Sequence, residues 1–84
     1  MTELEFDILD KLYFPSNIAH LQKETRLSVT LIKDTLWQMK KKDWIKILKN
    51  YDEEYDPTEE EFQKYFENYH YIATKKGLML HNSK

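Results

Sequence analysis

The sequence predicts an α+β domain in which three helices precede two strands and a short C-terminal helix. Apolar residues recur at helical spacing in three segments before residue 43. Residues 44–49 instead alternate apolar and polar side chains on a β-branched background, which predicts a strand. The chain has 84 residues, 40% of them hydrophobic, and no cysteine, so we predict one domain over 1–84 that no disulfide supports.

The first two helices are predicted over residues 3–13 and 17–24. Thr2 and Glu5 stand at the spacing of a capping box. A helical stripe of apolar residues follows this box: Leu4, Ile8, Leu9 and Leu12. Ser16 is predicted to cap the second helix, since a serine hydroxyl accepts a hydrogen bond from a free amide of the first helical turn.

Residues 28–42 form the helix around which the chain is predicted to be organised. One side carries apolar residues at helical spacing: Val29, Ile32, Leu36 and Met39. The opposite side carries Thr30, Asp34, Trp37 and Lys41. Ser28 is the predicted N-cap. A brief turn at residues 24–26, which Leu27 closes, leads from the preceding helix into this one, so residues 17–42 are predicted to form a helix-turn-helix.

The two predicted strands, 44–49 and 69–73, are expected to pair as a hairpin. The segment between them is acidic and leaves two alternatives open for residues 58–67. Thr58 and Glu61 have capping-box spacing, and aromatic residues follow at helical intervals, which favours a helix. An extended, acidic hairpin tip is the alternative.

Two short motifs carry a resemblance to a known family. Met39-Lys40-Lys41-Lys42-Asp43-Trp44-Ile45 is similar to an L-x-x-x-G-x-[IV] exit from a recognition helix, with Asp43 in place of the glycine. Tyr71-Ile72-Ala73-Thr74-Lys75-Lys76-Gly77-Leu78 is similar to a Y-x-L-T-x-x-G strand end. It places Thr74 at the cap of a short C-terminal helix, which Gly77 weakens by about 1 kcal/mol relative to alanine.

From residue 4 to about residue 80 the chain therefore resembles the winged helix-turn-helix DNA-binding domain of MarR-type and related small bacterial transcriptional regulators. The resemblance implies a three-helix core, with residues 44–73 as the wing and helix 28–42 in the DNA major groove. This wing is longer than usual and strongly acidic. A small regulator that binds double-stranded DNA, with or without sequence specificity, is the expected function.

The distribution of charge agrees with that expectation in one half of the chain. Residues 20–49 hold eight basic and three acidic residues, a net charge of +5. Thr30 and Lys33 are predicted to reach base edges, and Ser28, Lys40 and Lys41 to lie near phosphates. Ser16 and Asn17 are predicted to hold a further phosphate at the start of the second helix. The alternative is a solvated helix face and simple capping.

The other half of the chain points to a protein partner. Residues 50–68 hold eight acidic residues and one lysine, a net charge of −7, which phosphate would repel. We define residues 50–69 as the acidic insert. Its aromatic residues and the tryptophan of the long helix are candidates for a homodimer or partner contact, or for packing inside the domain: Trp37, Phe62, Tyr65 and Phe66. A protein-interaction module is therefore the alternative function.

Composition argues against most other classes of function. The chain has no cysteine and a single glycine, so no catalytic thiol and no glycine-rich phosphate loop is expected, and we predict a non-enzyme without a cofactor. The three histidines lie far apart in sequence, which argues against a metal site. No apolar run approaches the ~20 residues of a membrane span, and the first residues are acidic, so a cytoplasmic location without membrane contact is expected.

Overall fold

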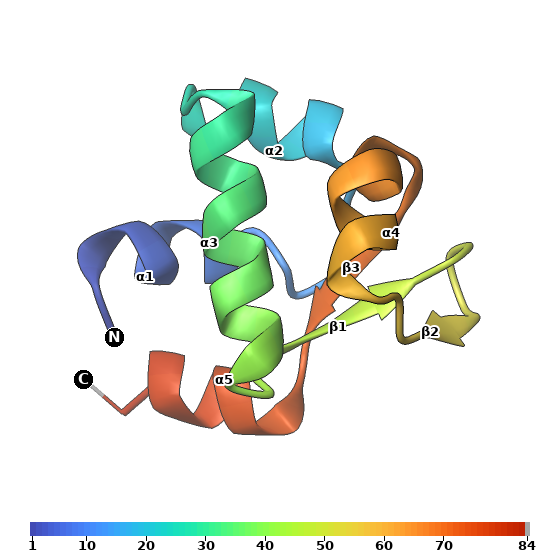
Figure 1. Cartoon of the computed structure of the whole chain (residues 1–84). Helices are drawn as coiled ribbons and strands as arrows, with labels where there is room; N and C mark the ends of the chain where they lie inside the picture. Colours follow the sequence, from blue (N-terminus) through green and yellow to red (C-terminus); the bar gives the residue numbers. More distant parts are fainter. Residues whose placement is uncertain (84) are drawn as a thin grey trace.

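A computed structural model describes residues 1–83 and shows an α+β fold with a three-stranded antiparallel sheet (Figure 1). Helix α3 stands near the middle of the view in Figure 1, with α1 to its left, α2 at its upper end, the sheet and α4 to its right, and α5 below it. The elements in chain order are α1 (Glu3–Leu9), α2 (Ile18–Thr25), α3 (Val29–Lys41), β1 (Ile45–Leu48), β2 (Glu54–Tyr55), α4 (Glu59–Tyr65), the 3-10 helix η1 (Phe66–Asn68), β3 (His70–Ala73) and α5 (Lys75–His81).

The predicted capping box at the start of α1 is confirmed, but the helix ends at Leu9 and not at residue 13. The two-way hydrogen bonds between Thr2 and Glu5 are both present. The apolar stripe is still in the core, because Ile8, Leu9 and Leu12 are fully buried. Leu12 leaves the helix because its carbonyl accepts a hydrogen bond from the Ala73 amide, at 2.8 Å, which ties this turn to β3.

The prediction that Ser16 caps α2 was wrong. The N-cap is Asn17, whose side chain accepts from the His20 amide at 2.9 Å. Ser16 instead forms a β-bridge with Tyr71, through two backbone hydrogen bonds of 3.0 and 2.8 Å. Its backbone is engaged in that bridge, so the next residue along the chain begins the helix.

Helix α3 follows its prediction closely. Ser28 is the N-cap, and its hydroxyl accepts from the Leu31 amide at 3.2 Å. The buried residues of α3 are Ile32, Thr35, Leu36 and Met39. Asp43, which stands in place of the family's glycine, has a φ of 62°, the left-handed conformation that glycine favours just after a helix.

The sheet contains one more strand than the sequence predicts. β1 pairs with β3 as expected, from Ile45 opposite Ala73 to Leu48 opposite His70. The additional strand β2 lies on the other edge of β1. It has two residues and no alternation of apolar side chains, so its sequence gives no strand signal.

The helical alternative for residues 58–67 is confirmed, since a capping box at Thr58 starts α4.

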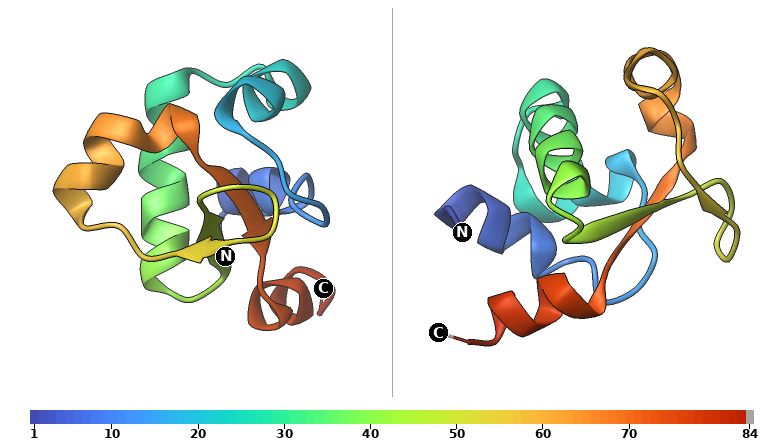
Figure 2. Two further views of the ribbon diagram at one scale, coloured as in Figure 1. Left: turned by 90° about the vertical axis from the view of Figure 1, so that its right-hand side faces the viewer. Right: turned by 60° about the horizontal axis from the view of Figure 1, so that its bottom comes forward.

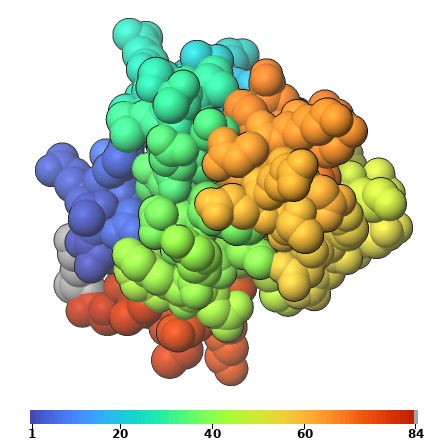
Figure 3. Space-filling model, viewed as in Figure 1, coloured from blue at the N-terminus to red at the C-terminus, as the bar shows by residue number. Residues whose placement is uncertain are grey.

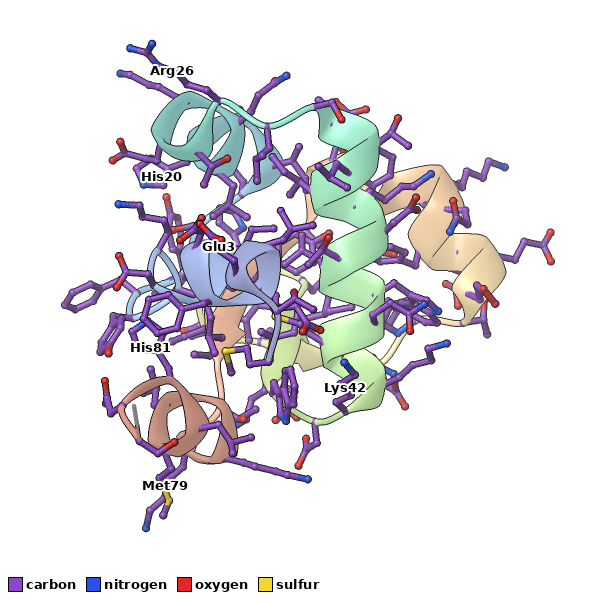
Figure 4. The ribbon with its side chains drawn as sticks, turned by 90° about the vertical axis from the view of Figure 1, so that its left-hand side faces the viewer. Glu3, His20, Arg26, Lys42, Met79 and His81 are labelled. Carbon is purple, nitrogen blue, oxygen red and sulfur yellow. The ribbon has the colours of Figure 1, made fainter. Side chains whose placement is uncertain are left out.

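Side chains from the helices, the sheet and the insert share one core. The fully buried residues include Ile8 and Leu12, Leu36 and Met39 of α3, Tyr71 of β3 and Phe62 of α4. Helix α5 closes the core beside α1 (Figure 2). His81 at its end stacks on Phe6, with ring centroids 4.1 Å apart, and its Nε2 lies 3.3 Å from the Asp10 carboxylate. Figure 4 shows His81 at this junction between the two helices.

A buried carboxylate links the start of α1 to the end of α3. Glu5 accepts hydrogen bonds from the Thr2 amide and from Lys42 Nζ, both at 2.9 Å. Burial by itself would raise the pKa of Glu5, but the Thr2 amide and the Lys42 ammonium outweigh it, and the net pKa is lowered from 4.5. A lowered carboxyl pKa stabilises the fold above the unfolded-state pKa, and that stabilisation is lost as pH falls through the folded-state value.

Glu5→Gln is therefore expected to destabilise the domain by about 1 kcal/mol at neutral pH. The difference from the unmodified chain should begin to shrink as pH falls below 4.5 and should vanish below the lowered folded-state pKa, where the carboxylate is protonated in both folded and unfolded chains. Urea unfolding at pH 7 and at pH 3 measures this difference. An equal loss of stability at the two pH values would contradict the assignment of the lowered pKa.

Candidate functional site

The polar surface of α3 divides into two stripes with different surroundings. One stripe faces solvent and consists of Thr30, Leu31, Asp34, Gln38 and Lys41. The other is half-buried and consists of Lys33, Trp37 and Lys40. Figure 3 shows the orange part of the insert lying against α3, drawn in green.

The half-buried stripe is covered by three successive contacts with the acidic insert. Lys40 forms an ion pair with Asp56, which lies between β2 and α4 in the insert. The Trp37 indole then stacks on Phe62, with ring centroids 4.8 Å apart. Lys33 Nζ lies 5.5 Å from the centroid of the Phe66 ring. The insert thus runs antiparallel to α3, from its C-terminal end toward its N-terminal end.

These contacts decide which of the predicted DNA-contacting residues are free. Thr30 and Lys41 are exposed, as the prediction requires. Lys33 and Lys40 have only 19% and 25% of their side chains exposed, and both face the insert. The Ser28 hydroxyl is occupied by its own helix cap. Within residues 1–83, Lys41 is the lysine of α3 that has neither an ion pair nor an aromatic ring as partner.

The second predicted phosphate site loses one of its two residues. Ser16 is 6% exposed, and its hydroxyl donates to the carbonyls of Lys11 and Phe14 at 3.3 Å each. Its amide donates to Tyr71. Asn17 remains at the start of α2, where its side-chain oxygen accepts from His20. The structure therefore assigns Ser16 to the packing of β3 and Asn17 to capping.

The predicted partner residues separate into buried and exposed side chains. Phe62 is fully buried, so its prediction as a contact residue was wrong and the alternative of internal packing is confirmed for it. Trp37 and Phe66 are half-buried against the same core. Tyr65 is 43% exposed and remains available to a partner. The aromatic stripe of α4 thus fixes the insert to the domain, because its rings meet Trp37 on α3 and Tyr71 on β3.

With its aromatic side buried, the insert presents its carboxylates to solvent. The exposed acidic residues are Asp52, Glu53, Glu54, Asp56, Glu59, Glu60 and Glu67. Glu61 differs from them, since it accepts a hydrogen bond of 2.7 Å from the Tyr55 hydroxyl. That bond raises the pKa of Tyr55 to about 12 and lowers the pKa of Glu61. Two exposed tyrosines accompany the carboxylates, Tyr51 at 68% and Tyr65 at 43%.

A second exposed surface, which the sequence did not indicate, lies on α5. Lys75, Lys76, Met79 and Leu80 line a shallow groove of about 400 Å³. Met79 is 63% exposed and projects away from the body of the molecule in Figure 4. Positions 75, 76, 79 and 80 do share one helical face, so this spacing was the available signal. Leu78 lies between them in the sequence and is half-buried, so the apolar residues of α5 do not all share this face.

No cluster of three or more metal-ligating side chains is found among residues 1–83. In the same range, no helix combines the length and the apolar character needed to cross a membrane. Comparison of the chain with protein-family models, curated proteins and solved structures finds no significant match.

Proposed function

We propose that the chain is a winged-helix-type module that binds a protein with a basic surface through its acidic insert. The order of elements supports the winged-helix assignment. The bridge of Ser16 with Tyr71 supports it too, because it pairs the segment between α1 and α2 with β3 as an additional strand would. The insert takes the position of the wing between β1 and β3.

One observation carries the choice of a protein partner over DNA. The insert covers the side of α3 that holds Lys33, Trp37 and Lys40, and it uses Asp56 to pair with one of those lysines. A DNA duplex that approached α3 would therefore meet the exposed carboxylates beside it, among them Glu59 and Glu60. Phosphates are repelled by such a surface, whereas lysine and arginine side chains of a protein are attracted to it.

The exposed aromatic side chains of the insert suit this role. Tyrosine is enriched among the residues that dominate binding energy at protein interfaces, because it contributes a large rigid surface and a hydroxyl. Tyr51 and Tyr65 stand among exposed acidic residues. The insert thus combines charge, which accelerates and orients association, with two apolar anchors.

The test compares a basic peptide with a DNA duplex as ligands. A lysine decapeptide is expected to bind the chain at low salt and to lose affinity as salt is raised, since exposed charges are screened. Reversing Glu59 and Glu60 to lysine should weaken this binding at least about tenfold. Reversing Glu3 and Asp7 on α1 is the charge-matched control and should leave most of the affinity. Failure of the decapeptide to bind at low salt would overturn the proposal.

Binding of double-stranded DNA is the second candidate, and the exposed stripe of α3 favours it. Thr30, Asp34, Gln38 and Lys41 are free to contact base edges or phosphates. For this function, Lys41→Ala should weaken binding to a mixed duplex at low salt, while Lys40→Ala should change it little because Lys40 is paired with Asp56. Duplex binding with this pattern, and none of the decapeptide, would establish the second candidate over the first.

A further inference from the structure

Two exposed surfaces with complementary chemistry lie at opposite ends of the sheet. The first is residues 51–54, which comprise the end of the loop between β1 and β2 and the first residue of β2, and which we call the hairpin tip. The second is the groove on α5. β1 begins at Ile45, opposite the residue that precedes the cap of α5, and ends at Leu48, shortly before the tip. The right-hand view of Figure 2 shows the tip projecting at one side of the molecule and α5 lying at another.

The hairpin tip combines one exposed aromatic ring with three consecutive acidic side chains. Tyr51 is 68% exposed. One side of its ring lies tilted against the His70 ring, with ring centroids 4.4 Å apart. Asp52, Glu53 and Glu54 are exposed, and none has an ion-pair partner within residues 1–83. The tip therefore presents an apolar anchor directly beside unpaired negative charge.

The groove on α5 has the opposite charge and an apolar floor. Met79 and Leu80 are 63% and 40% exposed, and they lie one helical turn after Lys75 and Lys76. Both lysines are exposed and lack an ion-pair partner in the described chain. An aromatic ring between Met79 and Leu80, with carboxylates against the two lysines, would satisfy both features of the groove.

We propose that the hairpin tip of one copy of this chain docks into the α5 groove of a second copy. This proposal rests on the proposed function, in which the acidic insert binds a protein, and it names that protein as the chain itself. The tip and the groove cannot meet within one molecule because the sheet separates them. Because the contact joins two different surfaces, each copy still has a free tip or a free groove after the first contact. Further copies can therefore bind head to tail, which gives short chains or a closed ring.

The strength of the association follows from the size of the surfaces. Four side chains on each partner bury far less than the ~1,600 Å² of a standard stable interface. The association is therefore weak, with a Kd on the order of 0.1–1 mM, and two pairs of exposed charges make it weaken as salt is raised.

Sedimentation velocity of the full chain at about 20 μM and about 1 mM tests the proposal, since the two concentrations bracket that Kd. The expected result is a monomer at the lower concentration and larger species at the higher, which dissociate in high salt. Two charge-reversal variants should each remain monomeric: Asp52→Lys/Glu53→Lys at the tip and Lys75→Glu/Lys76→Glu at the groove. An equimolar mixture of these variants should associate again, because each tip then faces a groove of opposite charge.

The control variant, Glu3→Lys/Asp7→Lys, makes the same change of charge on α1, outside the insert, and should self-associate like the unmodified chain. A monomer at about 1 mM overturns the proposal, as does a mixture of the two reversal variants that stays monomeric. If the lysine decapeptide still binds such a monomer, the proposed function stands and only the second copy as partner is wrong. If the chain stays monomeric and binds anionic phosphatidylglycerol vesicles through α5, the groove is a site for a lipid surface and not for a second copy.

Discussion

Gly77→Ala is expected to destabilise the domain by about 1–3 kcal/mol, although alanine is the better helix former. A Cβ at this position would stand 2.2 Å from the Trp44 carbonyl oxygen and 3.0 Å from the carbonyl carbon. Both atoms belong to the backbone that leads into β1, so they cannot move aside as a flexible side chain would. The added methyl group would therefore push α5 away from the backbone at Trp44.

Guanidinium chloride unfolding of the Gly77 variant, compared with Lys76→Ala on the exposed side of α5, measures this effect. Lys76→Ala should change the free energy of unfolding by less than about 0.5 kcal/mol, since its side chain is in solvent. The Gly77 variant should also lose the hydrogen bond from Thr74 to the Trp44 carbonyl, which is 2.9 Å long. A Gly77 variant that gains about 1 kcal/mol would mean that helix propensity decides at this position and that the close contact is absent.

Phe62→Ala is expected to cost about 3–5 kcal/mol, which is a large part of the stability of a domain of this size. The Phe62 ring is fully buried and stacks on Trp37, and it also meets the rings of Phe66 and Tyr71. Removal of the ring leaves a cavity between α4 and α3 and releases the insert from the helix it covers. The same variant should expose Trp37, which would shift its fluorescence emission to longer wavelength.

Tyr65→Ala serves as the control for this change, because Tyr65 belongs to the same helix and is 43% exposed. It should change the free energy of unfolding by less than about 1 kcal/mol. If Phe62→Ala and Tyr65→Ala have equally small effects, the insert is not part of the core. The covering of α3 would then be lost as an argument for a protein partner.

The local elements could be predicted because each depends on residues that are close in sequence. Thr2 and Thr58 start helices with a glutamate three residues later, and both capping boxes are present. Asp43 takes the left-handed conformation that its place at the end of a helix requires. The pairing of β1 with β3 followed from two β-branched or aromatic stretches on either side of the insert.

The surfaces could not be predicted because they depend on the path of the chain after residue 49. The charges of residues 20–49 and 50–68 were known, but nothing in the sequence places Asp56 beside Lys40, sixteen residues earlier. The same holds for Lys42, which pairs with Glu5 across 37 positions. The positive charge of residues 20–49 is thus partly neutralised in the fold, because Lys40 and Lys42 form ion pairs with carboxylates from other parts of the chain. The close approach of Gly77 to Trp44 is equally invisible until β1 and α5 are placed.

The position of the insert on α3 is the claim on which the choice of partner depends, and nuclear Overhauser spectroscopy of the full chain tests it directly. We expect strong cross-peaks between the Trp37 indole protons and the ring protons of Phe62, whose centroids lie 4.8 Å apart. Weaker cross-peaks should join the side chain of Lys33 to the ring of Phe66. Absence of these cross-peaks, with Phe62 at the chemical shifts of an unstructured chain, would show that the cationic side of α3 is open and would restore DNA as the first candidate.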